Sequence, residues 1–258
     1  MRRVHIHLGL ILTAGVILYS ILAVRAVRRS PVAVRLSFPA TDQVETVPIE
    51  WEAEFFASSK VRLDSPANRY PWFINTYGAG SEVTIEPDES AEGGWRLTVS
   101  TSTTVPGGGA YGQQGADKPP PSPWNDVDNA RGWSIEFSIK VASEGAARPQ
   151  VLSISDDAFG ENLLLHKDRI VLASTREIIP VDLGSRYTTL TVTARRNILR
   201  IFADGKRVYQ GIFATPKTGR GRNMTFGDDS PEPNQGGKTY WRSLRYTTRG
   251  PAEPRPRR

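Results

Sequence analysis

Acidic side chains are the first candidates for chemistry in this 258-residue sequence. Glu136 lies in the segment WSIEFSIKV at 133–141, whose polar positions also carry Ser134 and Lys140. Hydrolysis of a glycosidic bond uses two carboxyl groups, one as general acid and one as nucleophile or base. Glu136 is the only carboxylate on its segment and cannot supply both roles. It is therefore a weak catalytic candidate, and the sequence favours a protein that is not an enzyme.

Aspartates follow two segments that have strand character, in the pairs Asp156, Asp157 and Asp228, Asp229. Hard oxygen ligands at strand ends are what calcium needs, although aspartate also favours turns for purely local reasons. The four residues are therefore candidate ligands of a structural calcium ion. No cofactor is required by any other feature of the sequence.

The aromatic candidates lie in one long segment without periodicity, between Thr104 and Asn129, which contains three consecutive glycines and three consecutive prolines. A segment of this length in a compact domain tends to be either functional or disordered. Tyr111 and Trp124 could present rings that stack on a sugar from such a loop. They could equally pin the loop to the rest of the domain.

Cysteine and histidine exclude several kinds of site. The sequence has no cysteine, so neither a disulfide nor a thiolate zinc site can form. His5 and His7 lie close to the N-terminus, which leaves His166 as the one histidine in the rest of the chain. A metal site built from several histidines is therefore excluded.

The elements that must position these residues are β-strands. At 133–141 the apolar residues Ile135, Phe137 and Ile139 alternate with polar ones, and this period of two predicts a strand with one face in a core. Similar runs lie at 95–101, 150–155, 162–166, 168–173 and 188–194. Their short spacing between polar turns predicts an all-β fold, an antiparallel two-sheet β-sandwich.

Two short turns predict hairpins in the second half of the chain. Arg196-Asn197 joins the strand at 188–194 to a strand at 198–202, and Asp204-Gly205 leads from there to 206–209. Asp-Gly supplies the positive φ angles that a two-residue primed turn requires. The stretch 188–213 is therefore predicted to be a three-stranded meander.

An apolar leader occupies residues 1–29. Its 17 uncharged residues at 8–24 would span about 26 Å as a helix, slightly less than a hydrocarbon core of about 30 Å. We predict either a transmembrane signal anchor or a signal peptide cleaved near Val24-Arg25-Ala26. In both cases the domain lies on the extracytoplasmic side. It is held at the cell membrane by the N-terminal helix, or it is secreted or periplasmic after cleavage.

The net charge of +6 has its origin mainly in this leader. Five arginines flank the apolar span, and subtracting them from 33 basic residues leaves 28 against 27 acidic residues. The rest of the chain is thus close to neutral. It lacks the overall basic charge of a nucleic-acid-binding protein, so nucleic acid is not an expected partner.

Four segments in order resemble the concanavalin A-like lectin/glucanase superfamily, and within it the laminin-G-like jelly rolls: GWSIEFSIK at 132–140, IFADGK at 201–206, FGDDS at 226–230 and YWRSLRY at 240–246. The resemblance implies a jelly roll, which we place at 49–250. The sequence before it, at 30–48, reads as a linker and entry strand, and the tail at 251–258 has no periodicity and is expected to be flexible. Related jelly rolls often hold a structural calcium. The Glu-x-Asp-x-x-Glu cluster of the superfamily's glucanases does not occur here.

We therefore expect an exported, membrane-associated and non-catalytic binding module of the cell envelope, with a glycan or an envelope protein as its partner. The superfamily contains enzymes as well as binding modules, and a shared fold does not decide between them. One alternative is accordingly a carbohydrate-active enzyme, a glycoside hydrolase or lyase. A second is a structural or assembly protein that uses the domain only to contact another protein.

Overall fold

The computed structural model describes residues 51, 53–56, 72–89, 94–101, 109–115, 122–144, 150–213, 215–216, 221–228 and 237–252. All of them fall within the unit Val44–Arg258. The predicted leader at 1–29, with its apolar span at 8–24, and the linker at 30–48 lie outside the described residues. Among those described, no helix combines the length and the apolar character needed to cross a membrane.

The first of two antiparallel sheets carries the strand predicted at 133–141. Its strands are β1 (Ala53–Phe56), β3 (Glu82–Pro87), β4 (Trp95–Ser100), β6 (Trp133–Glu144), β11 (Thr188–Arg195), β12 (Ile198–Ala203), β13 (Lys206–Ile212) and β16 (Gly237–Thr247). They are ordered β13-β12-β11-β6-β16-β4-β3, and β1 pairs with β16 beside this path.

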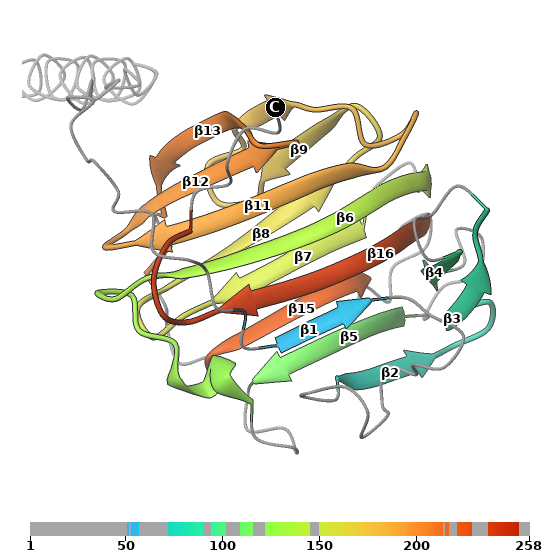
Figure 1. Cartoon of the computed structure of the whole chain (residues 1–258), viewed down its shortest axis with the longest axis horizontal. Helices are drawn as coiled ribbons and strands as arrows, with labels where there is room; N and C mark the ends of the chain where they lie inside the picture. The colour runs from blue at the N-terminus through green and yellow to red at the C-terminus, as the bar shows by residue number, and fades with distance from the viewer. Residues whose placement is uncertain are drawn as a thin grey trace, which may run out of the picture. The chain divides into compact units, whose positions relative to one another are not determined.

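The second sheet lies behind the first in the view of Figure 1. Its strands are β2 (Phe73–Tyr77), β5 (Gly109–Gly115), β7 (Gln150–Ser155), β8 (Phe159–Leu165), β9 (Arg169–Leu172), β10 (Ile178–Pro180), β14 (Thr215–Pro216) and β15 (Asn223–Asp228). The order is β10-β9-β8-β7-β15-β5-β2, with β14 paired to β8. The described part of the chain is therefore an all-β, two-sheet sandwich, as the sequence predicts.

Strand β6 shows why the two sheets pack together. Ile135, Phe137 and Ile139 are fully buried, while Glu136 and Lys140, which alternate with them, are partly exposed. The apolar face therefore points at the second sheet and the polar face points away from it. The space between the sheets is filled mainly by large aromatic and branched side chains: Trp124, Trp133, Trp241, Tyr246, Phe137, Phe213, Phe226, Leu97, Ile135, Ile139 and Leu152.

The predicted meander at 188–213 is confirmed as β11, β12 and β13 in consecutive order. Arg196 and Asn197 have φ angles of 48° and 60°, and Asp204 and Gly205 have φ angles of 49° and 81°. Positive φ at both central residues is the property of a type I′ turn, whose twist matches that of the strands it joins. Both hairpin turns are therefore of the primed kind.

The described residues between Thr104 and Asn129 contain regular structure that the sequence does not predict. They include the seven-residue strand β5 and a short 3-10 helix, η1 (Pro123–Asp126). Glycine disfavours strands, but here it is needed for packing. A Cβ atom at Gly112 would lie 2.5 Å from the Phe226 ring, and one at Gly109 would lie 2.5 Å from the Tyr77 ring.

Candidate functional site

The outer face of the first sheet brings together six polar and aromatic side chains, which we call the tyrosine–arginine cluster: Glu86, Asp88, Arg96, Tyr187, Tyr240 and Arg242. Leu97 and Trp241 are fully buried, so the residues that precede them, Arg96 and Tyr240, project from the opposite face. The cluster therefore faces away from the second sheet.

Backbone pairing sets the positions of these residues. Glu86 of β3 lies opposite Arg96 of β4, and Tyr240 of β16 lies opposite the next outward residue of β4, Thr98. Arg242 sits where the register between β16 and β6 shifts, with Trp241 and Ser243 on either side. A β-bulge of this kind inserts one residue and re-aims its side chain.

Arg96 links one half of the cluster. Its guanidinium donates to the Glu86 carboxylate, with an Nη2 to Oε2 distance of 3.1 Å, and its Cζ atom lies 3.8 Å from the centre of the Tyr240 ring. The contact combines charge-assisted hydrogen bonding with cation–π attraction. One face of the Tyr240 ring is therefore covered by a fixed positive charge.

Tyr187 and Arg242 form the other half. The Tyr187 hydroxyl donates to Asp88 Oδ2 at 2.5 Å, and the Arg242 Cζ atom lies 3.6 Å from the centre of the Tyr187 ring. Arg242 Nε is 4.0 Å from the same Asp88 oxygen. Burial, together with the hydrogen bond and the charge of Asp88, raises the pKa of the Tyr187 hydroxyl. Tyr187 therefore stays protonated at neutral pH and acts as a donor.

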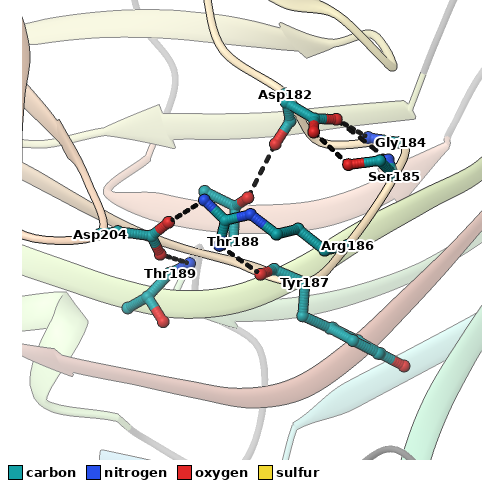
Figure 2. A network of polar contacts seen from close by, with 8 residues as sticks. All are labelled: Asp182, Gly184, Ser185, Arg186, Tyr187, Thr188, Thr189 and Asp204. Atoms are coloured by element: carbon teal, nitrogen blue, oxygen red, sulfur yellow. Dashed lines mark hydrogen bonds and ion pairs between the residues drawn. The ribbon is translucent and has the colours of Figure 1, made fainter.

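The loop before β11 holds Tyr187 in place through its own polar network (Figure 2). The Asp182 side chain accepts hydrogen bonds from the backbone of Gly184 at 3.1 Å and of Ser185 at 3.0 Å, and also from the Ser185 hydroxyl. The hydrogen bonds from Ser185 lower the pKa of Asp182. Figure 2 shows the Tyr187 ring projecting away from this turn.

The same network fixes the far end of the loop. Arg186 donates to Asp204 Oδ2 at 2.6 Å, and the backbone N–H of Thr189 donates to Asp204 Oδ1 at 2.9 Å. Asp204 belongs to the turn between β12 and β13. The loop that presents Tyr187 is therefore tied to the neighbouring hairpin as well as closed on itself.

Glu136 lies on this outer face, as predicted, but it is already paired. Its Oε1 atom accepts from Arg245 Nη2 at 2.6 Å and from Arg245 Nε at 3.0 Å. The Arg245 Cζ atom in turn lies 4.4 Å from the centre of the Trp51 ring. A carboxylate held by a bidentate arginine is poorly placed to act as an acid or a nucleophile. This geometry gives no support to catalysis by Glu136.

Trp124 does not lie where the ligand-binding prediction requires. Its side chain is 0% exposed, its Nε1 donates to the Ser155 carbonyl at 3.1 Å, and its ring packs edge-on against Trp133 and Tyr246. The backbone of η1 turns the ring inward. We correct the prediction accordingly: Trp124 is a core residue that fixes η1 to the sandwich, the second of the two roles open from the sequence.

Tyr111 is a partly exposed residue of β5 in the second sheet. Its hydroxyl accepts a hydrogen bond from Asn75 Nδ2 at 3.0 Å, across the pairing with β2. Neighbouring residues Ala110 and Gly112 are buried, so Tyr111 faces outward. It is thus separated from the tyrosine–arginine cluster by the thickness of the sandwich.

Asp156 and Asp157 lie apart from the backbone of Asp228. Asp156 follows the end of β7 that lies beside Asn223, whereas Asp228 is at the other end of β15. The Asp156 carboxylate is fully buried and accepts four hydrogen bonds, from Asn129 Nδ2, Trp133 Nε1 and the backbone of Ala158 and Phe159. Asp157 accepts from the Asn129 backbone at 2.6 Å.

The side chain of Asp228 and all of Asp229 lie outside the described residues. Among the described residues, no three histidine, cysteine or acidic side chains lie close enough together to hold a metal ion. The buried carboxylate of Asp156 is instead the anchor of the loop that carries η1.

None of the six residues of the tyrosine–arginine cluster was predicted from the sequence as a site residue. Tyr240 could have been found, because it alternates with the core residue Trp241 in the closing strand. Arg242, which follows Trp241, continues the same alternation and could have been found in the same way. Asp88 and Tyr187 flank β3 and β11, which lie apart in the sequence and are separated in the sheet by β4, β16 and β6, so nothing in the local sequence predicts their hydrogen bond.

The cluster suits binding better than bond cleavage. It offers two tyrosine rings, two guanidinium groups and two carboxylates, and the side chains of Glu86, Arg96 and Arg242 keep 32%, 25% and 24% exposure. These groups are held by one another, so little ordering is needed when a ligand arrives. They present hydrogen-bonding edges beside flat rings.

Comparison with known proteins shows a shared fold. None of the protein-family models matches the sequence, and no curated protein does. Domain 4 of AbnA, a GH43 extracellular arabinanase from Geobacillus stearothermophilus solved with arabinotriose, is similar in structure. The identity is 11%, the TM-score is 0.52, and the match covers 80% of this chain and 95% of that one.

Two further solved structures are similar over a comparable part of this chain. The carbohydrate esterase vb_24B_21 of the Shiga toxin-encoding bacteriophage phi24B matches with 11% identity and a TM-score of 0.52, over 76% of this chain and 97% of the esterase. The binding domain of botulinum neurotoxin DC, solved with rat synaptotagmin II, matches with 12% identity and a TM-score of 0.51, over 79% of this chain and 49% of that one. At these identities the likeness is one of β-sandwich fold.

Proposed function

We propose that this protein is a non-catalytic, glycan-binding module of the cell envelope, with a concanavalin A-like jelly-roll fold and a leader that exports it. The observation that carries the proposal is the tyrosine–arginine cluster. Sugars are bound by planar polar groups that reach several hydroxyls and by aromatic rings that contact their apolar faces. The cluster offers both on an open sheet.

The arabinanase domain supports a sugar as the ligand class. Its structure was solved with arabinotriose, and the match with this chain covers nearly the whole of that domain. The neurotoxin domain was solved with a protein instead. A protein partner is therefore the outcome that the binding experiment must separate from a glycan.

The state of the acidic groups supports binding without hydrolysis. Glu136 is held by Arg245, and Glu86 is held by Arg96. Asp88 is buried and accepts from Tyr187. Two-carboxylate hydrolysis needs one proton donor and one free base or nucleophile on either side of the scissile bond. The outer face, as far as it is described, presents no such pair.

The purified protein should be tested for retention on a panel of immobilised plant and bacterial polysaccharides that includes arabinan. We expect retention without release of reducing or unsaturated ends. The double variant Tyr240→Ala/Arg242→Ala, which removes two of the six cluster residues, should weaken retention at least tenfold. Lys167→Ala, at an exposed lysine outside the cluster, should leave retention unchanged. Sugar release that disappears in Glu136→Gln would establish the enzyme alternative. If the unmodified protein binds no polysaccharide of the panel and captures an envelope protein, the partner is a protein.

A further inference from the structure

Two lysines lie beside the tyrosine–arginine cluster on the same face of the first sheet. Lys140 of β6 is the direct cross-strand partner of Tyr240, and Lys238 precedes Tyr240 by two positions on β16. The residues on either side of each lysine along its strand are buried. Because side chains alternate between the two faces of a strand, both lysines project outward together with Tyr240.

Strand pairing brings the two lysines close to each other. Lys238 is a diagonal neighbour of Lys140 across the strand pair, and such residues lie roughly 7–8 Å apart. Each ammonium group is carried on a flexible four-carbon stem, so both groups are able to reach one point above the sheet. Tyr187 directly precedes β11, whose first residue pairs with the residue before Lys140. Lys140 therefore lies between the two tyrosines of the cluster.

The carboxylates next to these lysines are already paired with arginines. Three pairs each join one arginine to one acid: Arg96 to Glu86, Arg242 to Asp88 and Arg245 to Glu136. Lys140 and Lys238 form no hydrogen bond or ion pair with any residue in the described part of the chain. With the two lysines, five cations stand against three carboxylates, so two positive charges remain.

One further acid is in register with the lysines but does not neutralise them. Glu82 pairs with Ser100 of β4, and Ser100 pairs in turn with Lys238. Two strand spacings of about 4.8 Å separate Glu82 from Lys238, which is roughly 10 Å. Glu82 lies on β3, at the edge of the sheet, and is exposed. At that separation in water its charge screens the lysines only weakly.

Two ordinary roles of surface lysines do not account for this pair. Charges on an edge strand prevent unwanted pairing, but β6 and β16 are neighbours in the middle of the sheet. A lysine in full contact with water needs no partner, but Lys140 and Lys238 are both partly buried. A partly buried ammonium group loses some of its hydration, and here no carboxylate replaces it. An anion placed between the two lysines would offset that loss.

We infer that the tyrosine–arginine cluster takes an acidic sugar, and that Lys140 and Lys238 bind its anionic group. This inference rests on the proposed function and names the charge of the glycan. The rings of Tyr187 and Tyr240 contact the sugar, while the two ammonium groups beside them face its carboxylate or sulfate. An ammonium group is a compact point charge with three rotatable donors, so it suits either anion.

The test compares polymers that differ only in charge. Binding of the purified chain should be measured with polygalacturonate and with its fully methyl-esterified form, which has the same backbone and no charge. Dextran sulfate and dextran form the matched pair for sulfate. We expect the charged member of at least one pair to bind at least tenfold more tightly than the neutral one, and this preference to shrink as salt rises. Equal affinity within both pairs would overturn the inference.

Variants locate the anionic subsite. Lys140→Gln/Lys238→Gln should abolish the preference for the charged polymer and leave binding of the neutral polymer within twofold, which also shows that the variant is folded. Lys167→Gln/Lys206→Gln removes the same charge at two exposed lysines outside the cluster and should leave the preference unchanged. Equal losses in the two variants would contradict the assignment.

Other anionic partners are tested in parallel. Poly-glutamate represents an acidic protein segment, and phosphatidylglycerol vesicles represent an anionic membrane. Tighter binding to either one than to both charged polysaccharides would overturn the choice of a sugar.

The outcome can be separated from that of the proposed function. Retention of polysaccharides that is lost in Tyr240→Ala/Arg242→Ala, without any preference for the charged polymers, leaves the proposed function in place and refutes this inference. If the chain retains no polysaccharide, charged or neutral, the proposed function is refuted and the inference with it.

Discussion

At the scale of single residues, the outer face of the first sheet is defined by pairs that hold each other in place. Three arginines lie over aromatic rings: Arg96 over Tyr240, Arg242 over Tyr187 and Arg245 over Trp51. The first and third also donate to Glu86 and Glu136. Such pairs fix side chains that would otherwise be mobile, so the outer face of the first sheet is preorganised.

The hydroxyl of Tyr187 gives a test of this preorganisation through pH. Its folded pKa is raised above the ordinary value of about 10, so above pH 10 the unfolded chain loses this proton before the folded chain does. The contribution of this hydroxyl to the free energy of unfolding is therefore fully present below pH 10. It is lost as pH rises further, at a rate of at most about 1.4 kcal/mol per pH unit for one such group. Tyr187→Phe should flatten this fall, as measured by urea unfolding at pH 9, 10, 11 and 12.

Tyr209 provides the comparison. Burial and the nearby Glu177 also raise the pKa of Tyr209, which lies on β13 away from the cluster. Tyr209→Phe should also reduce the decrease in the free energy of unfolding above pH 10. The double variant Tyr187→Phe/Tyr209→Phe should show both reductions. A Tyr187→Phe protein whose stability falls between pH 10 and 12 as steeply as the wild type would show that the hydrogen bond to Asp88 is not made in solution.

Residue roles were predictable from the sequence only where strand alternation decides them. The outward position of Glu136 follows from its neighbours Ile135 and Phe137, and the structure confirms it. Trp124 has no periodic neighbours, and its inward direction depends on η1 and on its contacts with Trp133 and Tyr246. The contact with Tyr246 joins segments that are distant in the chain, and the sequence carries no local trace of it.

At the scale of elements, β6 is the strand on which the fold depends most. It lies between β11 and β16 at the middle of the first sheet, and its inner residues pack against the second sheet. The Phe137 ring lies 5.3 Å from the Trp241 ring, centre to centre. Removing this ring would leave a cavity that its rigid neighbours cannot fill.

Phe137→Ala should therefore lower the free energy of unfolding by about 3–5 kcal/mol. Glu136→Ala, one position along on the opposite face, should cost about 1 kcal/mol or less, because it removes a partly exposed ion pair with Arg245. Equilibrium denaturation of both variants gives the comparison. Equal losses would contradict the assignment of the two faces of β6, and a larger loss for Glu136→Ala would reverse it.

Strands with alternating apolar residues were predicted well, and the glycine-rich strand was not. The predicted bounds of 150–155 are those of β7, and the meander and its turns agree with β11 to β13. Strand β5, with the sequence GAYGQQG, has no alternation to detect. Its glycines make room for the rings of Tyr77 and Phe226, which come from other strands. The need for glycine in β5 arises from side chains on other strands, so it cannot be inferred from the sequence of β5 alone.

At the scale of the whole molecule, charge is separated by region in a way that total composition conceals. The basic residues flanking the leader and those at 186–212 supply the positive excess, while the remainder of the chain is slightly acidic. The residues at 186–212 form β11, β12 and β13 and the turns that join them, at one edge of the first sheet. Composition sets a limit on total charge, and the order of the strands decides where that charge acts.

The leader makes a prediction about the whole chain. A fusion of residues 1–40 to a reporter enzyme that is active only outside the cytoplasm should give activity, because the uncharged run at 8–24 is long enough to enter the membrane. The control is the same fusion with Leu12→Arg and Ile17→Arg. Arginine near the centre of a bilayer costs about 2.5–3.5 kcal/mol per residue on insertion scales, so this variant should lose activity. N-terminal sequencing of the full-length protein then separates the two forms of the leader, since an anchor keeps residue 1 and a cleaved signal peptide gives a new N-terminus near Ala26. A wild-type fusion that is produced in the cell but shows no reporter activity would contradict export and, with it, a place in the cell envelope.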